Sequence, residues 1–135
     1  MTLKLTEVSY TFPKQERKVI SRLNLEVKQG EFVSLIGKSG TGKSTVLKLI
    51  SGLIQQDEGE IEINGKAISL GDVGYMPQRD LLLPWRTILE NIMIAGEIQS
   101  HLKISKEQAR TWLERVDLLA YENALPNELS GGMRQ

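Results

Sequence analysis

Alternating apolar and polar residues predict strands in the first part of the chain. Residues 23–27 place an aliphatic side chain at every second position, which is typical of a strand with one buried face. Nearer the amino terminus, Leu3 and Leu5 are out of phase with Val8 and Tyr10. Because side chains alternate strictly along a regular strand, this change of phase predicts either a β-bulge or a position at the sheet edge.

Two further stretches predict strands without a polar face. Residues 31–37, EFVSLIG, are almost continuously apolar, as in strands that are buried on both faces of a parallel sheet. Residues 72–76, DVGYM, predict a shorter strand that ends at Pro77. We therefore expect a parallel sheet that contains these two segments.

The residues between these stretches predict a helix followed by a hairpin. Apolar residues at 46, 49, 50 and 53 recur at helical spacing, and Gly52 is a typical residue to end such a helix. Farther along, Ile61 and Ile63 alternate with glutamates and are followed by Asn64-Gly65. That dipeptide is strongly preferred in two-residue hairpin turns.

The last part of the chain has a helical pattern. Two pairs of residues have the spacing of a capping box, in which the side chains and backbone amides of a helix start bond each other. They are Thr87 with Glu90 and Ser105 with Gln108. Each pair precedes apolar residues at helical spacing, in 88–93 and 109–116, so two amphipathic helices are expected. Trp112 lies on the apolar stripe of the second helix and is expected in the core.

Composition narrows the class of protein. The chain has 135 residues, the length of one ordinary domain, with 17 Lys plus Arg and 17 Asp plus Glu. No net charge therefore draws it to nucleic acid or to an anionic membrane. The absence of cysteine excludes disulfides and thiolate metal sites. No apolar run has the length of a membrane span, and we expect a cytoplasmic protein that binds no nucleic acid.

A glycine-rich segment between the predicted strand 31–37 and the following helix is the main candidate for chemistry. It fits the pattern G-x-x-x-x-G-K-[ST] with Gly37, Lys38, Ser39, Gly40, Thr41, Gly42, Lys43 and Ser44. Its backbone amides and the positive end of the helix dipole suit the phosphates of a nucleotide. Lys43 is expected to reach the β and γ phosphates, Ser44 to bind Mg²⁺ through its hydroxyl, and Thr45 to support the turn.

Two more motifs accompany this phosphate loop. YMPQ, residues 75–78, ends the second predicted buried strand, and LSGGMRQ occupies residues 129–135. In this order and at these separations, the three motifs resemble those of the ATPase subunits of ATP-binding cassette (ABC) transporters. The resemblance implies an α/β P-loop NTPase core with an antiparallel β subdomain and a helical subdomain. The corresponding parts would be residues 1–82 (core and Gln78 loop), 83–128 (helical subdomain) and 129–135 (signature motif).

The resemblance also implies ATP and Mg²⁺ as cofactors, and roles for residues outside the phosphate loop. Gln78 would contact Mg²⁺ and the γ-phosphate region, since an amide offers both an acceptor and a donor. Phe12, or alternatively Tyr10, would stack on the adenine ring, and the alternative for either ring is a place in the core. The signature motif would cap the γ-phosphate bound by a second ATPase subunit, so a head-to-tail dimer is part of the chemistry. Its contacting residues would be Ser130, Gly131 and Gly132.

The segment DLLLPWRTILENI, residues 80–92, narrows the resemblance. It is most similar to the ATPases of bacterial importers for nitrate, sulfonates, taurine and related molecules. In these proteins the region docks the transmembrane permease, so Gln78 to Trp85 is a candidate docking surface, although Leu82 to Trp85 equally suit core packing. The resemblance implies a peripheral protein on the inner face of the membrane, served indirectly by a periplasmic or extracellular substrate-binding protein. His101, the only histidine, precedes the signature and is expected on a surface loop.

The catalytic residues of the family are expected after Gln135. They are the Walker B aspartate and glutamate, which act on Mg²⁺ and on the attacking water, and a switch histidine. Because charge placement accounts for most of phosphoryl-transfer catalysis, we expect residues 1–135 to bind ATP but hydrolyse it very slowly. We expect the amino-terminal part of a longer ATPase, truncated before a strand that would cover the apolar segment 31–37. The alternatives are a degenerate, non-catalytic nucleotide-binding fragment and a soluble ABC ATPase of translation or DNA repair.

Overall fold

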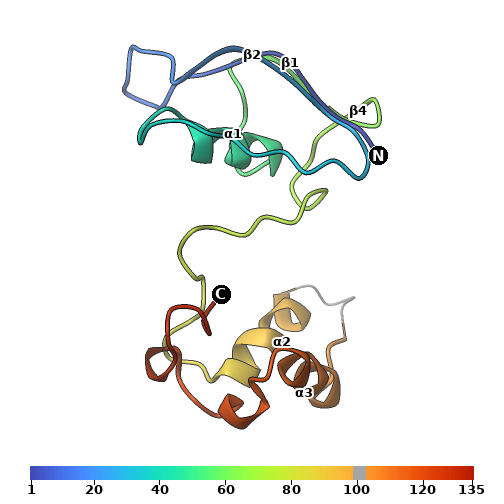
Figure 1. Cartoon of the computed structure of the whole chain (residues 1–135), viewed down its shortest axis with the longest axis vertical. Helices are drawn as coiled ribbons and strands as arrows, with labels where there is room; N and C mark the ends of the chain where they lie inside the picture. The colour runs from blue at the N-terminus through green and yellow to red at the C-terminus, as the bar shows by residue number, and fades with distance from the viewer. Residues whose placement is uncertain (99–102) are drawn as a thin grey trace. The chain divides into compact units, whose positions relative to one another are not determined.

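The chain forms two compact units, Met1–Met76 and Pro77–Gln135. The computed structural model describes residues 1–98 and 103–135, so the expectation for His101 lies outside the described residues. The first unit contains β1 (Leu3–Tyr10), β2 (Ile20–Val27), α1 (Lys43–Ile50), β3 (Glu58–Ile63) and β4 (Lys66–Ala67) (Figure 1). The second unit contains α2 (Ile88–Ile98), α3 (Lys106–Arg115) and the 3-10 turns η1 (Leu119–Tyr121) and η2 (Pro126–Glu128).

The sheet of the first unit is antiparallel, with strand order β2-β1-β3-β4. Strand β1 therefore lies in the interior of the sheet, so the alternative of an edge position is wrong and the predicted bulge is confirmed. Its pairing with β2 shifts register between Leu5 and Val8, and Glu7 within this interval has a φ of 51°. The bulge brings both Leu5 and Val8 into the core despite their different phase.

The predicted hairpin and helix of the first unit are confirmed. Residues Ile63 and Lys66 pair across a two-residue turn in which Asn64 and Gly65 both have positive φ, at 52° and 73°. Helix α1 ends in a Schellman motif: Gly52 N donates to Leu49 O at 3.1 Å and Leu53 N to Lys48 O at 3.0 Å.

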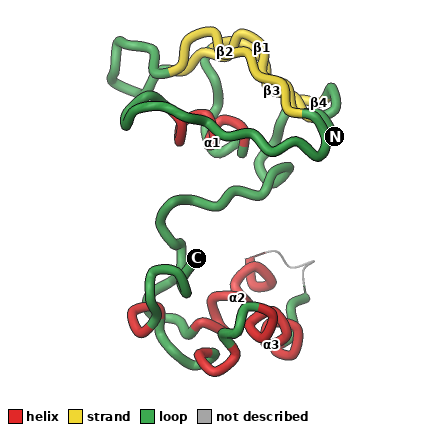
Figure 2. The backbone as a smooth tube through the Cα atoms, in the orientation of Figure 1, coloured by secondary structure: helices red, strands yellow, loops and turns green. Residues whose placement is uncertain are grey.

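Helix α1 lies along one face of the sheet (Figure 1, Figure 2). Its apolar residues at helical spacing meet the inward side chains of the strands, and together they form the core of the first unit. The buried residues of this core are Leu5, Val8, Tyr10, Ile20, Val46, Leu49, Ile50 and Ile61. This packing fixes the start of α1 against the sheet.

The predicted strands at residues 31–37 and 72–76 are wrong for the described residues. Neither segment is a strand, and no parallel pair occurs among the described strands. The side chains of Phe32 and Ile36 are 94% and 95% exposed, so their apolar surface lacks a covering neighbour, as expected from the sequence. The physical reason is that a strand buried on both faces needs paired strands at its edges and packed layers above and below.

The two helices of the second unit confirm the predicted capping boxes. Thr87 N donates to Glu90 Oε2 at 2.8 Å, and Ser105 N donates to Gln108 Oε1 at 2.9 Å, each with the reciprocal bond. The core of this unit consists of Ile88, Leu89, Ala109, Leu113 and Leu129. The expectation that Trp112 is a core residue is wrong, because its side chain is 43% exposed at the margin of the apolar stripe.

The boundary between the compact units falls between Met76 and Pro77. Residues 77–82, which the sequence assigns to the nucleotide-binding core, thus belong structurally to the unit with the helices; the functional division at residues 82 and 128 stays a prediction. None of the described helices has both the length and the apolar character required to cross a membrane.

Candidate nucleotide-binding and signature sites

The phosphate-loop residues form an exposed loop that leads directly into α1. Gly42 is the N-cap residue of the helix, with a φ of 92°, and its carbonyl accepts the first helical bond, from Val46 N at 2.9 Å. The amides of the first helical turn point out of the helix start and combine with its dipole to favour an anion there. The structure thus has a helix start at the predicted position, and the anion-binding role stays a prediction.

Lys43 lies across this loop. Its Nζ donates to the carbonyls of Gly37 and Lys38, both at 2.8 Å, and Thr41 Oγ1 donates to the same Lys38 carbonyl at 2.8 Å. These bonds connect the two ends of the loop of residues 37–43, and the ammonium group of Lys43 lies against its backbone. The structure therefore brings the loop carbonyls, the cationic side chain and the helix start together.

Gly42 packs too closely on the sheet for a larger residue. A Cβ on this glycine would lie 2.6 Å from Ile20 Cδ1 and 3.0 Å from Val19 Cγ1, and its φ of 92° is itself unfavourable for other residues. Gly40 also has a positive φ, of 80°, but a Cβ there would meet no atom within 4 Å. The loop is thus seated on the start of β2 at Gly42 and is open at Gly40.

A cavity of about 440 Å³ adjoins the phosphate loop within the first unit. It is lined by Gln15, Arg17, Lys18, Val19, Gly40 and Thr41. Volumes of a few hundred Å³ are typical of small-molecule sites. Lys18 also donates to Glu58 Oε2 at 2.6 Å, and this bond lowers the pKa of the glutamate. Arg17 and Lys18 make the cavity wall basic, which suits a phosphorylated ligand.

The two aromatic candidates for adenine stacking differ in exposure. Tyr10 is only 7% exposed within the core, whereas Phe12 is half-buried at its margin. Their rings meet edge to face, with centroids 5.2 Å apart and planes at 84°. Because a base needs an accessible ring face, the structure favours Phe12 over Tyr10. The stacking role itself stays a prediction.

Ser44 and Gln78, the predicted magnesium ligands, lie in different units. The side chain of Ser44 is exposed at the helix start, while Thr45 is 6% exposed and faces the core. In the second unit, Gln78 is exposed, and its carbonyl accepts a bond from Gln135 Nε2 at 2.9 Å. The described residues contain no cluster of three His, Cys, Asp or Glu side chains suited to a metal.

The signature residues form an exposed corner. Leu129 is buried at 5% exposure, and the chain then turns outward, with Ser130 Oγ accepting a long bond from Met133 N at 3.4 Å. Gly131 and Gly132 are exposed, and a Cβ on either would meet nothing within 4 Å. Two adjacent backbone amides and one hydroxyl are thus presented on the surface of the second unit, anchored by a buried leucine.

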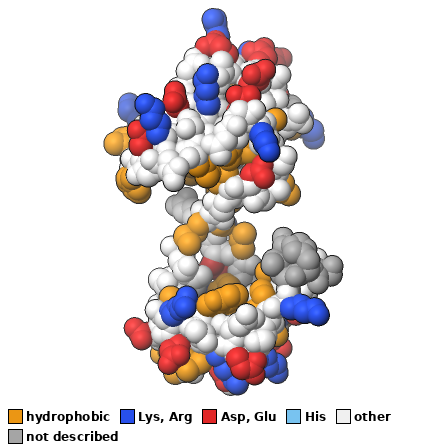
Figure 3. Space-filling model, turned by 90° about the vertical axis from the view of Figure 1, so that its right-hand side faces the viewer, with side chains coloured by type: hydrophobic (Ala, Val, Ile, Leu, Met, Phe, Trp, Pro, Cys, Tyr) orange, Lys and Arg blue, Asp and Glu red, His pale blue; other side chains and the backbone are white. Residues whose placement is uncertain are grey.

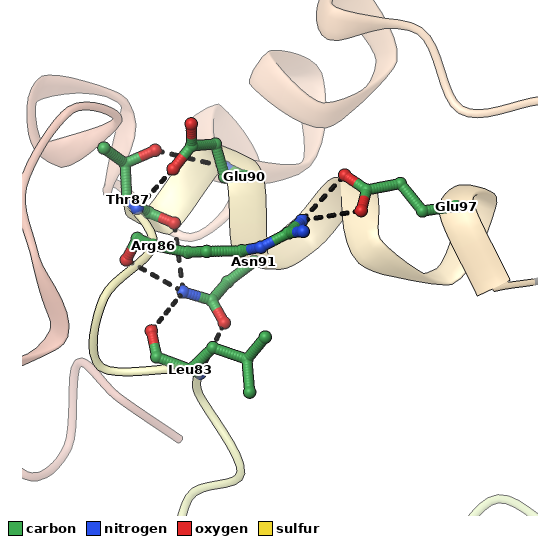
Figure 4. Close-up of polar contacts among 6 residues, drawn as sticks. All are labelled: Leu83, Arg86, Thr87, Glu90, Asn91 and Glu97. Carbon is green, nitrogen blue, oxygen red and sulfur yellow. Dashed lines mark hydrogen bonds and ion pairs between the residues drawn. The ribbon is translucent and has the colours of Figure 1, made fainter.

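The candidate docking segment is held by a residue that sequence analysis missed. Asn91 is 8% exposed and bonds the preceding loop through four contacts (Figure 4). Its Oδ1 accepts from Leu83 N at 2.7 Å, and its Nδ2 donates to the carbonyls of Leu83, Arg86 and Thr87 at 3.0 to 3.1 Å. The signal in the sequence was a lone polar residue on the apolar face of a predicted helix.

The loop held by Asn91 turns part of the apolar run outward. Leu82 packs against the core of the second unit, whereas Pro84 is exposed and Trp85 is 72% exposed. The run is therefore packed in the core at one end and exposed at the other, and the docking role stays a prediction. Hydrophobic side chains are also visible at the surface in Figure 3.

Two arginine–glutamate pairs charge the surface of the second unit. Arg86 bonds both carboxylate oxygens of Glu97 at 2.7 Å, and Arg110 bonds Glu122 at 2.6 and 3.0 Å. In each pair the hydrogen bond to arginine lowers the pKa of the glutamate. Each pair connects a helix to a residue outside it: Glu97 of α2 bonds Arg86 of the preceding loop, and Arg110 of α3 bonds Glu122 of the turn after η1.

The first unit carries the phosphate-loop motif at the start of α1, and the second unit exposes the serine-glycine corner. Together these motifs are typical of a nucleotide-binding cassette. The chain belongs to the ABC transporter family, whose model matches residues 20–135. Among solved structures it is similar to MJ0796, described as a bacterial ABC transporter cassette in a dimeric structure, with a TM-score of 0.80 and 32% identity over 98% of this chain and 65% of that one. A further structure of MJ0796, in a dimeric post-hydrolysis state bound to ADP and Pi, gives a TM-score of 0.79 with the same identity and coverage.

Curated relatives match along the whole chain. The aliphatic sulfonates import ATP-binding protein SsuB of Bacillus cereus is 41% identical over 100% of this chain and 55% of its own length. The formylaminopyrimidine import ATP-binding protein ThiZ of Halalkalibacterium halodurans is 43% identical over 98% of this chain and 52% of its own. The chain thus spans about half the length of these relatives.

Proposed function

We propose that this chain supplies the nucleotide-binding cradle of the ATPase subunit of an ABC importer, and that it binds ATP with Mg²⁺. The observation that carries the proposal is the loop of residues 37–43, closed by Lys43 on the Gly37 and Lys38 carbonyls and leading into the start of α1. The adjoining cavity, which Arg17 and Lys18 line, and the half-buried ring of Phe12 support a nucleotide with its phosphates on this loop. Ser44 and Gln78 are the proposed ligands of Mg²⁺.

Replacement of Lys43 tests the cradle. In a calorimetric titration with MgATP, Lys43→Ala is expected to abolish measurable binding, because the cation opposite the β and γ phosphates is lost. Lys48→Ala is the matched control, since it removes the same charge from the last turn of the same helix. Equal affinities of the Lys43→Ala variant and the unaltered chain would refute the cradle.

The importer is proposed from the names of the relatives and from the docking segment. SsuB and ThiZ are both named import ATP-binding proteins, and we infer a related small organic substrate for the importer of this chain. Pro84 and Trp85, exposed on the loop held by Asn91, would contact the transmembrane permease on the inner face of the membrane. Trp85→Ala is expected to prevent copurification with that permease, while Trp112→Ala is expected to retain it.

We also propose that the chain works as a head-to-tail dimer. Ser130, Gly131 and Gly132 would bond the γ-phosphate held by the cradle of the second copy, for which their exposure and open surroundings are suited. Hydrolysis would depend on the Walker B and switch residues of the family, which residues 1–135 do not include. Phosphate release by these residues is expected to equal that of the Lys43→Ala variant.

A further inference from the structure

The Gln78 loop and the signature corner are bonded to each other within the second unit. Gln135 Nε2 donates to Gln78 O at 2.9 Å, across 57 positions of sequence. Beside it, Arg134 Nε lies 3.2 Å from Asp80 Oδ2. Both segments have a proposed role at a γ-phosphate. Arg134 and Gln135, which follow Met133, connect them.

Arg134 is the centre of this connection. Its Nη1 donates to the carbonyls of Pro126 and Leu129 at 3.4 and 3.3 Å, in addition to the ion pair with Asp80. Leu129 is buried and directly precedes Ser130. A planar guanidinium holds its partners in a fixed fork, so these three contacts set the position of the corner relative to Asp80.

The ion pair matters because its nitrogen is enclosed. Arg134 Nε is a buried atom with no hydrogen-bond partner of good geometry, and the Asp80 carboxylate is the anion beside it. The two side chains are 33% and 31% exposed, so the pair as a whole is not buried, but removal of Asp80 would leave the enclosed Nε without the anion beside it and would loosen the guanidinium. Meanwhile the side chain of Gln78 is exposed and only its carbonyl is held.

We propose that Arg134 is a positioning residue which, through Asp80, couples the placement of the Gln78 loop to that of the signature corner. The coupling between the Gln78 loop and the signature corner concerns the second unit alone. A role of this coupling in sensing nucleotide rests on the proposed function. If Gln78 and Asp80 moved toward a bound γ-phosphate, Asp80 would pull the guanidinium of Arg134 with it. The signature residues Ser130 to Gly132, which would face the second subunit, would then shift.

Hydrogen exchange in the whole chain without nucleotide tests the coupling. Asp80→Asn keeps the carbonyl bonds of Arg134 but removes its counter-ion, and it is expected to raise exchange of the Leu129, Met133 and Arg134 amides about tenfold. The double variant Asp80→Arg with Arg134→Asp restores the opposite charges and is expected to recover much of this protection. Arg110→Gln, which breaks another arginine–carboxylate pair of the same unit, is the matched control and should leave these amides unchanged.

Protection of the α2 and α3 amides reports whether each variant folds. Unchanged exchange at residues 129–134 in Asp80→Asn, or an equal rise in Arg110→Gln, would overturn the coupling. Should Asp80→Asn expose α2 and α3 as well, Arg134→Lys decides: a rise confined to residues 129–134 supports the proposal, and none overturns it. Titration of Lys43→Ala with MgATP separately tests the proposed function, because that residue lies in the first unit.

Discussion

Replacing Asn91 by alanine tests how the second unit holds its docking loop. The buried amide of Asn91 accepts one bond and donates to three carbonyls, all from residues 83–87. An amide nitrogen carries two hydrogens, so one of the donated bonds is shared and the side chain makes about three full bonds. Alanine removes all of them and leaves the Leu83 amide without its partner.

The expected loss is large for so small a unit. Each net hydrogen bond contributes about 1 kcal/mol, so the Asn91→Ala variant should lower the free energy of unfolding of the second unit by about 3 kcal/mol. Domains of this size have roughly 3 to 9 kcal/mol of total stability. The substitution therefore brings the unit close to unfolding, and it frees the segment that carries Trp85.

Urea unfolding followed by tryptophan emission measures this effect selectively. Both tryptophans of the chain, Trp85 and Trp112, lie in the second unit, so the signal reports that unit alone. With an m-value of about 1 kcal/mol per M, the midpoint should fall by about 3 M. Arg86→Gln is the matched control, because it removes a partly exposed charged side chain from the same loop and breaks only its ion pair with Glu97; its midpoint should change far less.

The outcome that refutes the reasoning is specific. If the Asn91→Ala variant has the same midpoint as Arg86→Gln, the four contacts of the amide do not stabilise the unit.

Three further predictions concern the nucleotide site and pH. Phe12→Ala should weaken MgATP binding by roughly 1 to 3 kcal/mol in a calorimetric titration without unfolding the first unit, whereas Tyr10→Ala should unfold it; equal affinity of Phe12→Ala and the unaltered chain would exclude the stacking role. Gly42→Ala should lower the thermal midpoint of the first unit more than Gly40→Ala does, because only the former meets neighbouring side chains; equal losses would contradict the contact. Because the hydrogen bond with Arg110 lowers the pKa of Glu122, the folded state holds the carboxyl proton of Glu122 less tightly than the unfolded state does. Its contribution to the stability of the second unit is thus present above about pH 4.3 and is lost as the pH falls below that value; Glu122→Gln should flatten this part of a stability profile measured by urea unfolding.

The local elements were predictable from the sequence because their signals are local. The capping boxes at Thr87 and Ser105 and the turn at Asn64-Gly65 each involve residues within a few positions of one another. The phase change in the first strand was likewise visible as a bulge. Its interior place in the sheet was not, since that depends on pairing with β3 far along the chain.

Features that depend on distant partners escaped sequence analysis. Residues 31–37 have the composition of a buried strand, but strand formation requires neighbours that composition cannot supply. Asn91 was recognisable only as a polar residue on an apolar face, and nothing in the sequence connected Arg134 with Asp80. The phosphate loop was predictable because its function is carried by a continuous segment, while the seating of Gly42 on Ile20 required the fold.

The interior place of β1 has a consequence for how the first unit forms during synthesis. Leu3 pairs with Val27 on one side and with Ile63 on the other, so β1 is made before both of its partners and is enclosed only when β3 is available. Until residue 63 has left the ribosome, one edge of β1 stays unpaired and can join a neighbouring chain instead. Completion of this sheet is therefore delayed until residue 63 has emerged, and mistakes at that stage would appear as intermolecular sheets.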